Sequence, residues 1–284
     1  MNVLKTAFLL TALTMLLVFG GQALGGRQGM TIALIMALVM NGGAYFFSDK
    51  IALMSSGARP ATREQAPRLY ASVERLAARG HLPMPKVYII PQPAPNAFAT
   101  GRNPRHAAVA ATEGLLQVMN DDELDGVIAH ELSHVRNYDI LTASIAATLA
   151  GAITWMAHMA QWAMIFGGGR SRDDDRGGGG LTALAMLILA PIAAMIVQLA
   201  ISRQREYAAD ASAARLVGHP YGLVSALEKL GAYNKRIPMD VPPATSSLFI
   251  VAPLSAGQAF SRLFSTHPPL EKRIAALRQM VVSQ

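Results

Sequence analysis

The amino-acid sequence predicts a mainly α-helical integral membrane protein with four transmembrane helices and an α+β domain that carries a small sheet. Its 284 residues are 52% hydrophobic and only 15% charged, whereas about 25% of the residues of a typical soluble protein are charged. Four long stretches contain no charged residue, while two segments, one in the middle of the chain and one at its end, carry ten Lys and Arg residues each. The mean hydropathy of +0.30 supports the same class.

Each uncharged stretch is long enough to cross a bilayer, because about 20 predominantly apolar residues in a helix span the hydrocarbon. The four stretches pair into two hairpins. The predicted spans lie at about 7–24, 30–47, 141–166 and 181–201. The chain then divides into a hairpin at 1–48, a first soluble part at 49–139, a second hairpin at 140–202 and a second soluble part at 203–284.

Each hairpin has an alternative. Lys5, the apolar stretch after it and the sequence "ALGG" are also typical of a cleaved signal peptide, but a second apolar stretch follows almost at once and favours a hairpin. The later pair has the alternative of two buried helices in a soluble core, which their length and lack of charge disfavour. His158 lies in the middle of the third span, where polar residues are often functional. We interpret it as a histidine that is hydrogen-bonded inside the helix bundle.

The distribution of positive charge predicts that both soluble parts and the N-terminus are cytoplasmic. The two connecting loops carry one and three Lys or Arg residues, against ten in each soluble part, and cytoplasmic segments are enriched in these residues. The second loop, 167–180 ("GGGRSRDDDRGGGG"), is interpreted as a flexible exposed link without an inferred role. Nucleic-acid binding is an alternative explanation of the net charge of +7. No basic patch interleaved with aromatic residues supports it, so no nucleic-acid partner is expected.

The chain has no cysteine, so a bound metal must be held by His, Asp or Glu. The stretch "VIAHELSHV", Val127–Val135, offers such ligands. Asn120, followed by Glu123 three residues later, is typical of a helix start. Apolar residues then recur at helical spacing, which predicts a helix over 121–137 that runs on, after a break, toward the third span.

His130 and His134 lie one turn apart on one face of this predicted helix, where two imidazoles can bind one zinc ion. Glu131 is rotated by about 100° from His130, so it can reach a water at the zinc without being a ligand. Zinc polarises the scissile carbonyl and activates the water, and Glu131 takes up the proton and passes it to the leaving amine. This is the H-E-x-x-H arrangement of metalloproteases. The alternative is a pair of exposed histidines beside a surface glutamate.

A catalytic zinc needs a third protein ligand and an open position for water. The candidates after the motif are Glu206, Glu228 and Glu271. We favour Glu206, because "SRQREYAAD" places Asp210 four residues later, where it can orient a ligating histidine. A solvated helix face is the alternative for this pair. Two predicted spans separate Glu206 from the motif, and an even number of crossings returns the chain to the same side of the membrane.

Three stretches, "HELSHVRNYD", "SRQREYAAD" and "STHPPLEKRI", make the chain resemble the HtpX heat-shock membrane metalloproteases, bacterial relatives of the zinc-dependent CAAX prenyl proteases. The resemblance extends along nearly the whole chain. It implies one zinc ion per chain, held by His130, His134 and Glu206. It further implies that Glu131 is the general base and that Asp210 is the acid following the third ligand.

The resemblance also bears on residues outside these ligands. Asn137 and Asp139 match family positions, and the alternative to a role in the site is that they end the helix at the membrane boundary. His267, in "FSTHPPLEKRI", is a candidate donor to the oxyanion formed during attack on the peptide. The alternative is a histidine in a Pro-rich loop before a helix at 270–281.

Three short strands are expected before the motif. The sequence "KVYII" at 86–90 is typical of a strand, "PQPAPNAFATG" of a loop with a short strand, and "HAAVAAT", His106–Thr112, of another strand. An edge strand near the zinc would let a peptide substrate pair with it through main-chain hydrogen bonds. An ordinary small sheet without that role is the alternative.

These observations predict a membrane zinc endopeptidase whose zincin-like (gluzincin) α+β domain is built from 49–139 and 203–284. The resemblance implies that it cuts misfolded or damaged membrane proteins, as part of a stress response, at the cytoplasmic face of the cell (inner) membrane. Its expected partners are membrane-protein or peptide substrates and the lipid bilayer, and the sequence sets no oligomeric state. One alternative is a processing protease for a defined prenylated or signal-like peptide. Another is a zinc-stabilised membrane scaffold, although structural zinc sites normally have four protein ligands.

Overall fold

The computed structural model describes residues 2–149, 203–237, 239, 241, 243–251 and 268–280. The predicted third and fourth spans therefore lie outside the described residues, except for the helical start of the third, Asp139–Leu149. His158, the 167–180 loop and His267 lie outside them as well.

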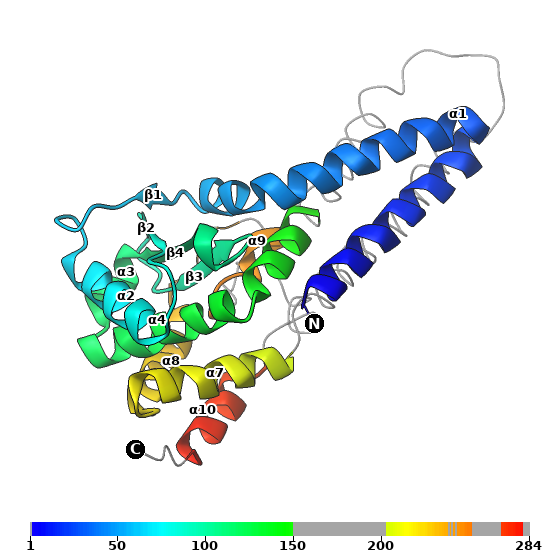
Figure 1. The fold of residues 1–284 in the computed structure, drawn as a ribbon. Helices are drawn as coiled ribbons and strands as arrows, with labels where there is room; N and C mark the ends of the chain where they lie inside the picture. The colour runs from blue at the N-terminus through cyan, green and yellow to red at the C-terminus, as the bar shows by residue number, and fades with distance from the viewer. Residues whose placement is uncertain are drawn as a thin grey trace.

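The N-terminal helix α1, Asn2–Ser55, folds back on itself as a hairpin of two long arms, which project from one side of the rest of the described chain (Figure 1). The reversal coincides with Gly26, whose φ of +57° is in the left-handed region that favours glycine. The arms are joined by Asn41, whose Nδ2 donates to Thr14 Oγ1 at 2.8 Å and to Leu10 O at 3.3 Å. Hydrogen bonds of this kind are typical of helices that pack inside a membrane.

The second arm is long and apolar enough to cross a membrane. It runs over Gly26–Ser55, contains the predicted span at 30–47, and is the one candidate span within the described part of the chain. Its apolar side chains face outward, as the half-exposed Ile35, Met36 and Leu38 show, which fits a lipid environment. The prediction of a membrane hairpin is thus supported for one span, and the count of four spans stays a prediction.

The predicted sheet is present and mixed, with the strand order β1-β2-β4-β3. β2 and β4 pair in parallel, while β3 pairs antiparallel with β4 and β1 antiparallel with β2. This order leaves β3 at one edge of the sheet. The strands are β1 (Arg59–Pro60), β2 (Lys86–Ile90), β3 (Ala97–Gly101) and β4 (Ala107–Thr112).

The expected strands are confirmed, with one shift of a boundary. His106 belongs to the 3₁₀ turn Pro104–His106 and not to β4, because Asn103 Oδ1 accepts a hydrogen bond from the His106 N–H and holds the chain in a turn. Every residue of β3 and β4 is buried. Four of the six residues of β4 and two of the five residues of β3 are alanine, so other elements can approach the sheet closely.

Helix α4 (Asp121–Arg136) lies at the centre of the helical layer and contacts α2, α7, α8 and β3. One apolar cluster joins these elements and includes Leu69, Ile128, Leu227 and Leu277, which come from distant parts of the chain. The remaining helices are α2 (Pro67–Arg79), α3 (Glu113–Val118), α7 (Arg203–Val217), α8 (Tyr221–Asn234), α9 (Pro243–Ser246) and α10 (Leu270–Arg278).

The start and end of α4 follow the sequence pattern. Asn120 Oδ1 accepts from the Glu123 N–H and Glu123 Oε2 accepts from the Asn120 N–H, both at 2.9 Å, so the predicted helix start is a capping box. The helix ends at Arg136, one residue before the predicted end, because Tyr138 adopts a left-handed φ of +60°. A further helix begins at Asp139, so the predicted break is confirmed.

Candidate metal centre

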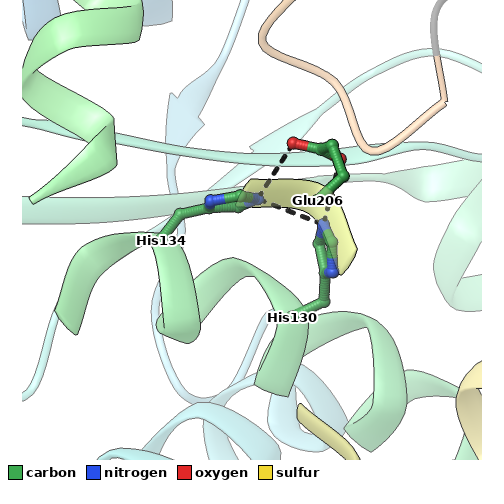
Figure 2. Close-up of side chains that lie close together, drawn as sticks. All are labelled: His130, His134 and Glu206. Atoms are coloured by element: carbon green, nitrogen blue, oxygen red, sulfur yellow. Dashed lines mark hydrogen bonds and ion pairs between the residues drawn. The ribbon is translucent and has the colours of Figure 1, made fainter. Parts of the chain in front are cut away.

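Three potential metal ligands meet where α4 packs against α7. His130 and His134 project from successive turns of α4, and Glu206 reaches them from α7 (Figure 2). One ligand atom of each lies within 4.8 Å of the other two. His130 is 1% exposed and Glu206 is 3% exposed, so these polar groups are held out of water together.

The spacing of the two Nε2 atoms and the two Glu206 oxygens fits a zinc ion. The two Nε2 atoms are 3.2 Å apart, Glu206 Oε1 is 3.5 Å from His134 Nε2, and Glu206 Oε2 is 3.7 Å from His130 Nε2. Ligands at the usual zinc distances with tetrahedral angles lie roughly 3.3–3.6 Å apart. Two imidazoles and one carboxylate are also a ligand set that zinc accepts, and three protein ligands leave a position open.

Both histidines are oriented by carboxylates behind them. The His130 Nδ1–H donates to Asp210 Oδ1 at 2.9 Å, and the His134 Nδ1–H donates to Asp139 Oδ2 at 3.1 Å. Each bond holds the Nδ1 proton in place, so that Nε2 faces the other ligands and can bind a metal in the neutral imidazole. Asp139 also accepts from Arg205 Nη1 of α7 at 3.1 Å. The structure therefore places Asp139 in the site and not only at a helix end.

Arg273, on α10, is the site residue that the sequence reasoning missed. Its side chain is 0% exposed, and its Nε and Nη2 donate to the two oxygens of Asp210 at 2.8 and 2.6 Å. Its Nη1 lies 3.7 Å from Glu206 Oε2. Leu270, Ile274 and Leu277 form the apolar face of α10. An arginine on that face, at position 273, is the sequence pattern that could have predicted a buried, paired cation.

The other glutamates considered as a third ligand lie elsewhere. Glu228 is on α8, 46% exposed, and pairs with Arg278 at 2.5 Å. Glu271 is an exposed residue in the first turn of α10. Of the three candidates, the structure brings only Glu206 to the histidines.

Glu131 lies beside the ligands without joining them. It is 1% exposed, and its Oε1 has no hydrogen-bond partner in the described part of the chain. Burial, reinforced by the charge of Glu206, raises the pKa of Glu131 to about 8 despite the opposing charge of His134 and a backbone hydrogen bond from Ala99. A free acceptor atom with this basicity is suited to exchanging protons near neutral pH.

The two histidines titrate in opposite directions in the metal-free protein. Burial and the charge of Arg273 lower the pKa of His130 to about 4, although the hydrogen bond that its Nδ1–H donates to Asp210 acts to raise it. For His134 burial also disfavours the charged form, but the hydrogen bond with Asp139 and the charges of Glu206 and Glu131 raise its pKa to about 9. At neutral pH, the His130 imidazole is therefore uncharged, whereas the His134 side chain is the charged imidazolium.

A small cleft opens on the site. Its walls include Ala99 of β3, Glu131, His134, Glu206 and Ile250. The cavity volume is about 40 Å³, which exceeds the roughly 10–15 Å³ that a cavity needs, on the same measure, to hold one water molecule. A water molecule in the cleft can thus reach Glu131, His134 and Glu206 together.

A buried His-His-Glu set with an adjacent free carboxylate on the same helix defines the class of metallopeptidase sites. The family model for peptidase family M48 matches residues 63–281. The chain belongs to this family and is a metallopeptidase.

Curated relatives extend the match along nearly the whole chain. A Protease HtpX homolog of Desulforapulum autotrophicum is 58% identical over 277 residues, which cover 98% of this chain and 89% of the relative. A Protease HtpX homolog of Syntrophotalea carbinolica is 56% identical over 283 residues, which cover 99% and 100%. These matches confirm the resemblance inferred from the sequence and support a membrane metalloprotease.

A solved structure shares the fold. The crystal structure of S. mikatae Ste24p aligns with a TM-score of 0.53 at 20% identity, over 97% of this chain and 64% of that one. The present chain therefore spans somewhat less than two thirds of that protein. At this identity the similarity shows the fold alone.

The titration of His134 makes a first prediction. Because a metal displaces a proton from a charged histidine, the affinity of the Glu131→Gln protein for Zn²⁺ should rise with pH up to the pKa of His134, which is about 9 in the wild type and lower in this variant because the charge of Glu131 is absent. Binding at pH 7 should release about one proton. Calorimetry in buffers of different ionisation enthalpy measures this number. An affinity that is constant between pH 6 and pH 9 would contradict the assignment.

Arg273 gives a second prediction. Arg273→Met leaves the buried carboxylates of Asp210 and Glu206 without their cation, so we expect a loss of about 3–5 kcal/mol of unfolding free energy. We also expect zinc affinity to fall by roughly 10–100-fold. The matched control is Arg278→Met on the same helix, whose exposed ion pair should contribute at most about 1 kcal/mol. Equal effects of the two substitutions on thermal unfolding would disprove the special role of Arg273.

Proposed function

We propose that this chain is a zinc-dependent endopeptidase of the cell (inner) membrane that cleaves misfolded or damaged membrane proteins at the cytoplasmic face. The observation that carries the proposal is the position of Glu131, whose carboxylate has a free oxygen and which lines one cleft together with two members of the ligand set, His134 and Glu206. The similarity to curated HtpX proteases supports the same class. Quality control of membrane proteins comes from the family resemblance.

The residues of the site support hydrolysis by an attacking water. His130, His134 and Glu206 would hold a zinc ion, which would supply Lewis acidity to polarise the peptide carbonyl and acidify the attacking water. Glu131 Oε1 takes a proton from that water and delivers it to the leaving amine. Asp210 and Asp139 hold the two imidazoles in the tautomers and orientations that this arrangement needs. We propose His267 as the donor to the oxyanion that forms during this attack.

The edge strand β3 supports binding of an extended peptide. Main-chain groups alternate in direction along a strand, and the hydrogen bond from the Ala99 backbone to Glu131 shows that Ala99 faces the site. A peptide that pairs with β3 would therefore run past Glu131, with its main chain recognised and its side chains free to vary. Such recognition suits an enzyme with many unrelated substrates.

The membrane placement rests on α1 and on the order of the chain. The candidate span Gly26–Ser55 leads directly into the described helices and strands. We propose four spans, with soluble parts at 49–139 and 203–284 that share one side of the membrane. Helices α4 and α7, which carry the ligands, come from these two parts and contact each other.

The catalytic roles give a third prediction. Glu131→Gln should keep one zinc per chain but lose cleavage of a membrane-protein substrate, by about 10³-fold or more, because the amide cannot accept the proton. Glu206→Ala should lose zinc. Metal analysis and gel-based cleavage assays measure both. Wild-type cleavage by Glu131→Gln would favour a zinc-stabilised scaffold with a contaminating protease, and full zinc in Glu206→Ala would remove Glu206 from the ligand set.

The four-span topology gives a fourth prediction. Since the chain has no cysteine, single cysteines at Ser171 and Ser265 can be labelled selectively. A membrane-impermeant maleimide added to intact spheroplasts should label position 171, and position 265 should react only after the membrane is opened. Labelling of both positions from the same side would show that the number of spans is wrong.

A further inference from the structure

The segment Ser247–Val251, "SLFIV", lies against the edge of β3 beside the metal centre. We refer to it as the strap. The Ile250 N–H donates to Ala97 O at 3.0 Å. Asn96 binds both main-chain groups of Val251, because its Nδ2 donates to Val251 O at 2.8 Å and its Oδ1 accepts from the Val251 N–H at 3.4 Å. The backbone of the strap is thus bound by the Ala97 carbonyl of β3 and by the side chain of Asn96, the residue before β3.

The strap also contacts the residues that surround the ligands. Arg273 Nη1 donates to Ile250 O at 3.0 Å, and the same guanidinium holds Asp210. Leu248, Phe249 and Ile250 line the cleft that contains Glu131. The main chain of the strap therefore passes within the cleft in which a substrate carbonyl must be placed.

Side chains fix the strap at its centre. Phe249 is 0% exposed, and its ring contacts that of Phe98 on β3, with centroids 5.0 Å apart at 70°. Edge-to-face pairs of this kind stabilise packing beyond simple burial. Phe249 is therefore the anchor of the strap, and its removal should loosen the strap.

We propose that the strap is an internal substitute for a peptide substrate, which occupies part of the β3 edge in the resting enzyme and must move aside for a substrate to bind. This inference rests on the proposed peptidase function. Extended peptides bind a sheet edge through main-chain groups such as the Ala97 carbonyl, which the strap already uses. Because a substrate binds only the strap-free state, its apparent affinity is reduced by the fraction of molecules in that state.

A permanent wall is the competing explanation, and the two make opposite predictions. If the strap is a wall, a peptide pairs only with Ala99 and Gly101, and loosening the strap damages the groove. If the strap is a substitute, loosening it exposes more of the edge and helps binding. The effect of the strap on the KM of a peptide substrate therefore separates them.

The first test replaces the anchor. Phe249→Ala in the full-length, zinc-loaded protein should raise kcat/KM for a soluble fluorogenic peptide by roughly tenfold, mainly through a lower KM. Phe249→Leu, which keeps an apolar anchor, should stay within about twofold of the wild type. An unchanged or lower kcat/KM in a folded Phe249→Ala protein with full zinc would overturn the proposal.

The second test needs neither catalysis nor a changed strap. The zinc-loaded Glu131→Gln protein is mixed with the same peptide, and hydrogen exchange is followed by mass spectrometry. Faster exchange at the Ile250 and Val251 amides with saturating peptide is the expected result, since the substrate takes their partners. Unchanged or slower exchange would show a permanent wall. Failure of the peptidase function itself would appear separately, as equal cleavage by the wild type and Glu131→Gln.

Discussion

The packing of α4 against α7 is the contact on which the site depends. Helix α4 supplies His130, His134 and Glu131, while α7 supplies Glu206 and Asp210, and the two helices are far apart in the sequence. Each helix alone would present unpaired polar groups to an apolar core, at a cost of several kcal/mol. When the helices pack together, Asp210 of α7 accepts a hydrogen bond from His130 of α4, and the ligand atoms of His130, His134 and Glu206 face one another. The long apolar insertion between them therefore has to return the chain to the same place.

Charge balance explains the other buried groups. Three carboxylates, Glu131, Glu206 and Asp210, lie within one buried region and would repel one another if none were compensated. Arg273 compensates Asp210 and holds the pKa of that carboxyl at about 2, although burial acts to raise it. A divalent cation at the His-His-Glu set would balance much of the remaining negative charge. Arg273 thus connects Asp210, which orients His130, to the Ile250 carbonyl of the strap.

The part of this site that follows local rules was predictable from the sequence. The capping box at Asn120 and the four-residue spacing of the histidines and of Glu206 with Asp210 depend only on helix geometry. The roles of Arg273 and of the strap depend on contacts between segments distant in the sequence. Burial of an arginine is unfavourable in isolation, and only its partners make it stable. Helical spacing in the sequence therefore identified the candidate ligands. Arg273 and the strap could be found only from contacts in the folded protein.

The central claim is that His130, His134 and Glu206 hold one zinc ion in the cleft beside Glu131. X-ray absorption spectroscopy of the zinc-loaded full-length protein tests it most directly. We expect about two imidazole nitrogens at roughly 2.0–2.1 Å and oxygen ligands at about 2.0–2.2 Å, with the imidazole signal reduced by half in the zinc that His134→Ala retains. A spectrum with no imidazole, or one that His134→Ala leaves unchanged, would contradict the account.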